Sequence, residues 1–198
     1  HDGNIVTAGN LGGGGTLHIN LNVKGNTGLN VTAGNTALNL ASVDKDNKAF
    51  VKNTGTVTIE GKGILLAGSD KTISLSNQGL IDLKVVDKAN EGKGNSVISS
   101  GEAVNVANYG TITLNINSED FLDKYNKDKG EKKVTDLKDL TIEQVRATLV
   151  ELGIIESDSE GTFTSLGSIE FAEGAVYTTG EELTGNVEVG GLIATLKK

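Results

Sequence analysis

The stretch Asn53-Thr54-Gly55-Thr56-Val57-Thr58-Ile59 decides the fold, because its last five residues return as a phrase along the chain. The phrase is a turn glycine, usually a small polar residue, and then aliphatic, polar and aliphatic residues. This alternation is typical of a strand with one face in a core. The other copies occupy residues 15–19, 79–83, 110–114 and 167–171, and a weaker copy occupies 36–40.

The spacing of the copies indicates how such strands are assembled. Most copies follow one another at intervals of roughly 20 to 30 residues, the range in which one repeat is one structural unit of a solenoid. One such strand cannot bury its apolar face alone, but a stack of strands can. The sequence therefore predicts an all-β solenoid of seven or eight turns, with Val57 lying over Ile81 and then over Ile112.

Asparagine recurs at one place in the repeat. Asn53, Asn77 and Asn108 each stand two residues before the repeat glycine. Stacked asparagines can form a ladder of side-chain amide hydrogen bonds. The alternative is that asparagine is used only because it tolerates the backbone of a tight corner.

Composition narrows the class of protein further. The 198 residues include 27 Gly, three Tyr and four Phe, with no Pro, Cys, Met or Trp. Scarce aromatics predict a narrow core of aliphatic residues. The net charge of -8 disfavours nucleic acid and anionic membranes as partners. No apolar run is long enough to span a membrane, so we expect no membrane insertion by this segment. Because the chain begins with His1 rather than Met, we expect an excised or processed fragment.

The repeat is interrupted after Asn117, where the sequence predicts helices. A first helix is expected from Ser118, its cap, through Tyr125. Thr141 and Gln144 have the spacing of a capping box for a second helix, which should end at Gly153. We expect strand turns over residues 1–117, a helical insertion looped out of the stack over 118–158, and strand turns again over 159–198.

The insertion is the expected site of recognition, because loops on a rigid scaffold often carry binding residues. It contains a local run of lysines, and its two rings, Phe121 and Tyr125, could act as exposed anchors. The candidate receptor-binding residues are Phe121, Tyr125, Lys129, Lys132 and Lys133. The alternative for the two rings is packing against the second helix.

The iterated Asn-x-Gly-Thr-aliphatic-x-aliphatic pattern, at 53–59 and again at 108–114, resembles the passenger domains of Gram-negative autotransporter adhesins. The large surface autotransporters of fusobacteria are the most similar in character. The resemblance covers everything outside the insertion, and no individual functional residue can be transferred from it. It implies a right-handed parallel β-helix that belongs to a larger outer-membrane-anchored protein at the bacterial cell surface. The implied partner is a host-cell surface protein or glycan, or a partner bacterium, and we expect the segment to be monomeric.

Two other classes of function compete with adhesion. One is a purely structural stalk segment of a longer passenger. The other is a polysaccharide-active β-helix enzyme, which needs clustered carboxylates on one strand face. We expect no enzyme, because the repeat places Asp82 between Thr58 and Thr113 and not beside another acid. With two histidines and no cysteine, we expect no metal site and no cofactor.

Overall fold

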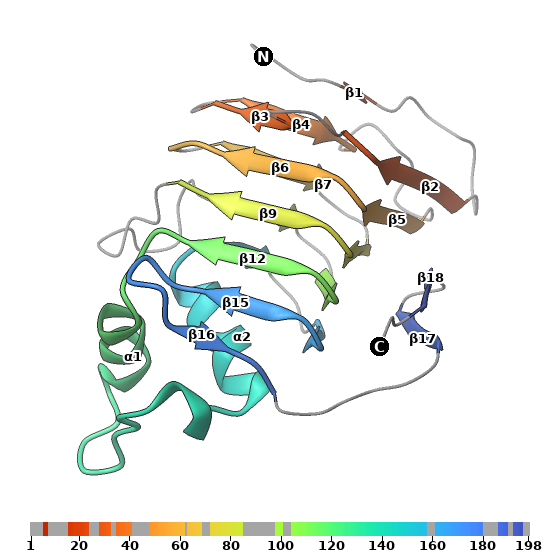
Figure 1. Cartoon of the computed structure of the whole chain (residues 1–198). Coiled ribbons are helices and arrows are strands. Elements are labelled where there is room, and N and C mark those ends of the chain that lie inside the picture. The colour runs from red at the N-terminus through yellow and green to blue at the C-terminus, as the bar shows by residue number, and fades with distance from the viewer. Residues whose placement is uncertain are drawn as a thin grey trace.

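The structure is a computed structural model of the whole chain (Figure 1). It describes residues 6–7, 16–23, 28–32, 35–40, 48–61, 63–68, 72–84, 98–100, 104–157, 161–179, 186–189 and 192–195. His1 and the first repeat glycine, Gly15, lie outside these residues. The described fold is mostly parallel β-sheet with two short α-helices.

Three sheets make up the body of the protein. The first has the order β1 (Val6–Thr7), β4 (Thr36–Asn39), β7 (Ile64–Gly68), β10 (Ile98–Ser100), β13 (Ile155–Ser157). The second has the order β14 (Phe163–Ser165), β11 (Val104–Asn108), β8 (Ile73–Asn77), β5 (Lys48–Asn53), β2 (Thr16–Leu21). The third has the order β16 (Val176–Tyr177), β15 (Ser168–Glu170), β12 (Thr111–Leu114), β9 (Leu80–Leu83), β6 (Thr56–Ile59), β3 (Leu29–Val31).

The chain visits the three sheets in turn, so up to β15 each sheet takes every third strand, and neighbouring strands run parallel except for the pair β15 and β16. Among the described residues this gives five successive triplets of strands, from β1–β3 to β13–β15, rather than the expected seven or eight turns. The expected number was too high because a triplet uses more chain than the spacing suggested. From the start of β4 at Thr36 to the start of β7 at Ile64, for example, is 28 residues.

The register expected for the repeat is confirmed in the third sheet. Val57 pairs with Ile81, and Ile81 pairs with Ile112. All three side chains are buried in one hydrophobic core. The repeat glycine is required there by close approach of the backbones: a Cβ atom on Gly79 would lie 2.0 Å from the carbonyl oxygen of Gly55.

Two copies of the phrase lie outside the third sheet. The copy at 15–19 contributes to β2 in the second sheet, and the copy at 36–40 forms β4 in the first sheet. The strand that pairs with β6 in the third sheet is β3. The same alternation suits a strand of any of the three sheets. Three of the copies in the third sheet have an asparagine two residues before the glycine, and the copy at 167–171 has Ser165 there, whereas the copy at 15–19 has Gly13.

The asparagine ladder is confirmed. Asn53 Nδ2 donates to Asn77 Oδ1 at 2.9 Å, and Asn77 Nδ2 donates to Asn108 Oδ1 at 2.9 Å. Asn108 Nδ2 then donates to Ser165 Oγ at 3.1 Å. All four side chains are buried, so the ladder satisfies polar groups that would otherwise be costly to bury. It joins four neighbouring strands at the corner where the second sheet turns into the third.

The helices form where the sequence predicts them. α1 spans Ser118–Asn126, a 3-10 turn η1 spans Leu137–Asp139, and α2 spans Ile142–Glu151. The capping box of Thr141 and Gln144 is present, and Gly153 follows α2 with a φ of 74°. Ser118 is the first helical residue rather than the cap. Its backbone N–H donates to Glu173 Oε1 at 2.9 Å, so a distant carboxylate takes the place of a local cap.

The helical insertion, here residues 118–154, packs on the end of the sheets instead of looping out. α2 contacts β13 and β14, and α1 contacts α2 (Figure 1). Phe121, Val145 and Leu149 belong to the same buried cluster as the strand residues Phe163 and Ile169. The expectation of a looped-out insertion was wrong because the apolar helix faces cover the last triplet of strands. Residues 155–157, expected within the insertion, form β13 and extend the first sheet.

Candidate functional site

A cleft of about 380 Å³ opens where the helical insertion meets the last strand of the third sheet. Its walls come from α1, from the segment that includes η1, and from β16. The lining residues are Ser118, Leu122, Thr135, Asp136, Leu137, Lys138, Ala175, Val176, Tyr177 and Thr178. The cleft therefore combines three parts of the chain that are far apart in sequence.

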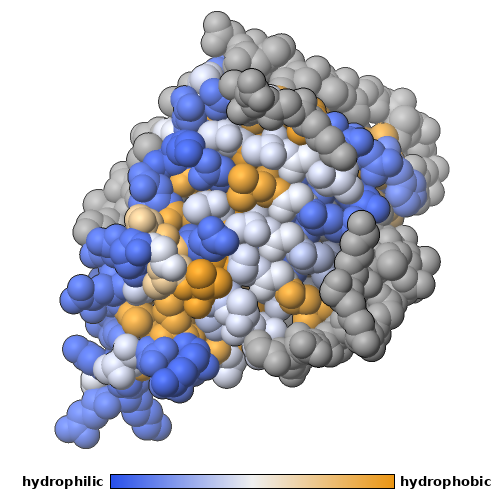
Figure 2. All heavy atoms as spheres, in the orientation of Figure 1, coloured by the Kyte–Doolittle hydropathy of each residue, from blue (hydrophilic) through white to orange (hydrophobic). Residues whose placement is uncertain are grey.

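The cleft has an apolar wall that is open to solvent. Leu122, Leu137 and Ala175 are partly buried and pack against the core. Val176 is 50% exposed. Among the described residues, two large hydrophobic side chains are exposed, and Val176 is the more exposed of the two. Figure 2 shows apolar surface gathered over this part of the molecule. Such a surface with a polar rim is typical of a site that binds another molecule.

An ion pair lies on the rim of the cleft. Lys138 Nζ lies 2.9 Å from Asp136 Oδ2, and the backbone N–H of Lys138 donates to Asp136 Oδ1 at 3.0 Å. The side-chain bond to Lys138 holds the pKa of Asp136 below its usual range, and the same bond raises the pKa of Lys138. Both groups stay charged over a wide pH range. The rim thus offers one donor and one acceptor of opposite charge.

The floor of the cleft is fixed by Tyr177. The Tyr177 side chain is buried, and its hydroxyl donates to the carbonyl oxygen of Leu140 at 3.1 Å. Burial raises the pKa of this hydroxyl, and the nearby charge of Glu143 adds to the effect. The hydroxyl therefore keeps its proton and its hydrogen bond at physiological pH. This contact ties β16 to the segment between η1 and α2.

The candidate residues of the sequence fall into two groups. Phe121 is 1% exposed, and its ring meets Phe171 edge-on with 5.2 Å between the ring centres. Phe121 thus supports the core beneath the insertion, and its packing partner is a strand-side ring. The other four residues lie at or near the surface. Tyr125 accepts a hydrogen bond from Gln144 Nε2 at 2.7 Å, and Lys129 Nζ lies 5.1 Å from the centre of the Tyr125 ring.

The loop that carries the lysines is held by a residue that the sequence reasoning missed. Asn126 Nδ2 donates to the carbonyl oxygen of Val134 at 2.7 Å, and the Val134 N–H donates to Asn126 Oδ1 at 2.9 Å. This pair of bonds closes the loop over 127–133, in which Lys132 and Lys133 are exposed. The sequence feature that could have indicated this role is an asparagine at the end of a predicted helix. No sequence feature of this kind predicts the cleft, because the cleft depends on a contact between distant segments.

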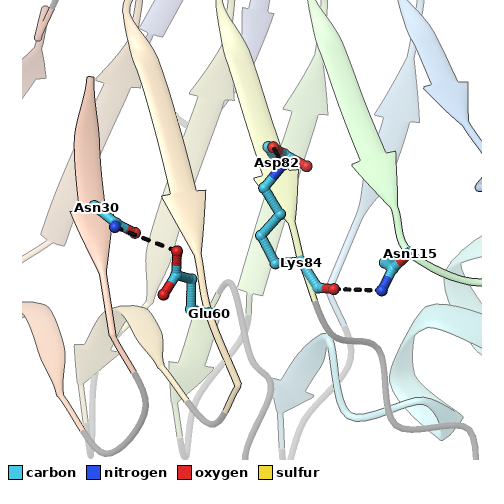
Figure 3. Close-up of polar contacts among 5 residues, drawn as sticks. All are labelled: Asn30, Glu60, Asp82, Lys84 and Asn115. Carbon is cyan, nitrogen blue, oxygen red and sulfur yellow. Dashed lines mark hydrogen bonds and ion pairs between the residues drawn. The ribbon is translucent and has the colours of Figure 1, made fainter. Parts of the chain in front are cut away.

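A second cluster of charged residues lies on the outer side of the third sheet (Figure 3). Asp82 lies between Thr58 and Thr113, as expected. Lys84 Nζ lies 2.6 Å from Asp82 Oδ2, and this hydrogen bond raises the pKa of Lys84. Glu60 is on the neighbouring strand connection, where Glu60 Oε1 accepts from Asn30 Nδ2 at 3.3 Å.

The charges of this cluster are satisfied within it. Asp82, and to a smaller extent the charge of Glu60, raises the pKa of Lys84. Asn115 Nδ2 donates to the carbonyl oxygen of Lys84. An exposed pair of this kind contributes little to stability. The arrangement has the residue types of a polysaccharide-cleaving site, but Asp82 is held in an ion pair.

The described part of the chain shows little sign of a metal site or of a membrane-spanning helix. No group of three or more His, Cys, Asp or Glu residues there could hold a metal ion. His18 stacks on Phe50, with 5.3 Å between the ring centres. Among the described helices, none is both long enough and apolar enough to cross a membrane.

Comparison with known proteins gives no match: no family model, no curated protein and no solved structure is similar to this chain.

Proposed function

We propose that the chain is a segment of a bacterial cell-surface adhesin. In this proposal the three parallel sheets are the faces of a right-handed β-helix, and the helical insertion contacts a receptor. The receptor is a host-cell surface protein or glycan, or the surface of a partner bacterium. The segment acts as a monomer outside the cell, within a larger protein anchored in the outer membrane.

The strand order supports the β-helix. Each sheet collects every third strand, and neighbouring strands in a sheet are parallel apart from β16. Chains that coil in this way bury one continuous core between their faces. The buried aliphatic residues of all three sheets belong to one cluster, and the asparagine ladder follows one corner. These features suit a stiff scaffold that holds a binding surface away from the cell.

The observation that carries recognition is the open apolar cleft on an otherwise well-packed insertion. A stalk needs no exposed apolar surface, and a fully packed insertion would have favoured the stalk. Val176 is 50% exposed beside the partly buried Leu122 and Leu137. The rigid floor at Tyr177 keeps the cleft in shape before any partner arrives, which lowers the cost of binding. Tyr125, Lys129, Lys132 and Lys133 extend the proposed contact surface along the insertion.

The stalk segment remains the alternative, and it predicts that binding is located elsewhere in a longer passenger. An enzyme acting on polysaccharides is a weaker alternative, which would use Glu60 and Asp82. Asp82→Asn would then abolish release of reducing sugar ends from acidic polysaccharides. We expect no such release from the unaltered protein.

Binding of the purified chain to host cells and to partner bacteria tests the adhesin proposal. Val176→Glu places a charge on the apolar wall and should weaken binding at least tenfold. Val23→Glu is the matched control, because Val23 is an exposed valine outside the cleft, 39% exposed, and belongs to the other end of the sheets. Equal binding by both variants would remove the cleft from the proposal. No binding by the unaltered chain would favour the stalk.

The lysine loop is tested separately. Lys129→Ala, Lys132→Ala and Lys133→Ala together should weaken binding and reduce its dependence on salt. Lys84→Ala is the control, since Lys84 is an exposed lysine on the third sheet. If the control weakens binding as much as the triple change, the loop makes no specific contact.

A further inference from the structure

The outer side of the second sheet carries polar side chains that are buried without partners. On β8, Ile73 and Leu75 point into the core, and the alternating residues Ser74 and Ser76 lie on the outer side. Each of these two serines is only 1% exposed. Neither hydroxyl has a hydrogen-bond partner.

Buried polar atoms without partners also occur at the end of β8. Gln78 Nε2 and Tyr109 Oη are also buried without a partner. Tyr109 follows Asn108, which pairs with Asn77, so Tyr109 lies beside Gln78. Burial raises the pKa of the Tyr109 hydroxyl. We call Ser74, Ser76, Gln78 and Tyr109 the covered strip.

Four such atoms in a row are unusual, because buried polar atoms nearly always have a hydrogen-bond partner. Leaving a donor unsatisfied forfeits the hydration it had in the unfolded chain. A row of unsatisfied donors on one face is therefore a place where a hydrogen-bonding ligand would gain affinity.

A hairpin lies outside this part of the second sheet. β17 (Asn186–Val189) and β18 (Leu192–Thr195) pair only with each other among the described strands. β17 contacts β11, the strand next to β8. A two-stranded hairpin is marginally stable by itself. It is therefore suited to move away from the sheet at a low cost in free energy.

The side chains on this face are suited to donate hydrogen bonds to an anion. The chain contains 26 acidic residues, yet the five strands of the second sheet contain none. Lys52 pairs with Ser76 in the register and supplies a positive charge beside the strip. All four atoms of the covered strip can donate hydrogen bonds. At the other end, Phe50 pairs with Ser74, and the ring of Phe50 stacks on His18.

We propose that the outer side of the second sheet binds an acidic oligosaccharide, and that the β17–β18 hairpin is the cover that the ligand displaces. Hydroxyl and carboxylate oxygens of the ligand accept hydrogen bonds from the covered strip. A ligand carboxylate pairs with Lys52, and the apolar face of a sugar ring lies against His18 and Phe50. Ser74 to Gln78 spans about 13 Å along the strand, which suits a short oligosaccharide better than a single sugar.

This site is separate from the cleft of the helical insertion and does not depend on it. A peptide that adds to a sheet binds at a strand edge, where main-chain groups are free. β8 and β11 are inner strands with neighbours on both sides, so their outer side offers side chains only. A ligand rich in oxygen acceptors fits this face better than a peptide does.

Titration of the ¹⁵N-labelled full chain with a hyaluronan hexasaccharide, which carries a carboxylate on alternate sugars, tests the proposal. We expect amide shifts in residues 73–78 and 104–109, with affinity that falls as salt is raised. Amide hydrogen exchange in residues 186–189 and 192–195 should become faster in the complex. A neutral chitin hexasaccharide should bind at least tenfold more weakly. Absence of hyaluronan binding, or equal binding of the neutral sugar, would overturn the proposal.

Paired variants separate a binding role from a structural one. Ser74→Ala with Ser76→Ala should weaken hyaluronan binding at least tenfold, while the melting temperature of the free protein stays the same or rises. Thr58→Ala with Thr113→Ala, on the outer side of the third sheet, is the control and should bind normally. Val176→Glu should also bind hyaluronan normally, so failure of the adhesin cleft leaves this result unaffected. Full binding by the serine variant, or a hairpin that stays protected in the complex, would refute the site.

Discussion

The strands and the helical insertion are held together in different ways. In the strand stack, a residue meets its equivalent in the next triplet, as Asn53, Asn77 and Asn108 do. In the insertion, each contact occurs once. Phe121 meets Phe171, and the backbone of Ser118 meets the carboxylate of Glu173.

The difference matters for how each region responds to change. A repeated contact has a neighbour on both sides, so a substitution in the middle disturbs two bonds at once. A substitution at a unique contact disturbs that contact only. Both regions nevertheless share one hydrophobic core. We therefore expect the sheets and the insertion to unfold together, with different sensitivity to single substitutions.

Breaking the ladder in its middle should have the largest effect. Asn77→Ala removes the acceptor for Asn53 Nδ2 and the donor to Asn108 Oδ1, and both groups remain buried. We expect a loss of about 5 kcal/mol in the free energy of unfolding, because each unsatisfied group is costly. Urea denaturation followed by circular dichroism measures the loss.

A milder change checks the cause of that loss. Ser165 occupies the ladder position on β14 and accepts from Asn108, so Asn77→Ser should cost clearly less than Asn77→Ala. Thr58→Ala, on the outer side of β6, should change stability by less than about 0.5 kcal/mol. An equal loss for the serine and alanine variants would mean that side-chain size, not the ladder, governs stability.

Removing the ring of Phe121 tests the shared core. Phe121→Ala leaves a cavity against Phe171, and we expect a loss of about 4 kcal/mol in a single cooperative transition. Scanning calorimetry distinguishes this from separate melting of the insertion. Tyr125→Phe is the control, since it removes only the hydroxyl that accepts from Gln144. Two separated transitions in the Phe121 variant would show that the insertion is an independent unit.

Much of the fold follows from the sequence because the strands repeat. The alternation in 55–59, 79–83 and 110–114 predicts both the strands and their register, and the pairing of Val57 with Ile81 and of Ile81 with Ile112 confirms it. The sheet to which a strand belongs is harder to predict, because alternation looks the same on every face. An asparagine before the glycine is only a partial sign of the third sheet, because β15 also belongs to that sheet and has Ser165 in this place.

The candidate site was less predictable than the strands. Capping residues locate α2, since the bonds between Thr141 and Gln144 are local in sequence. The packing of the insertion depends on contacts with Phe171 and Glu173, which lie beyond the next strands of the chain. No local pattern reports such contacts. The sequence alone is therefore compatible with Phe121 as an exposed anchor and with Phe121 as a core residue.

The bond between Glu173 and Ser118 provides the finest test of how the insertion is attached. Burial alone would raise the pKa of Glu173, but the hydrogen bonds from Ser118 outweigh it and hold the pKa below its ordinary value of 4.5. A lowered pKa in the folded state stabilises the protein above pH 4.5, and this contribution is lost as the pH falls below that value. Because Glu173 is exposed, solvent screens the interaction, and we expect Glu173→Gln to cost only about 0.5 kcal/mol at pH 7. Denaturation of both proteins from pH 7 to pH 3 measures the difference, which should shrink toward the acidic end. A difference that stays constant with pH would mean that the amide and the carboxylate hold α1 equally well.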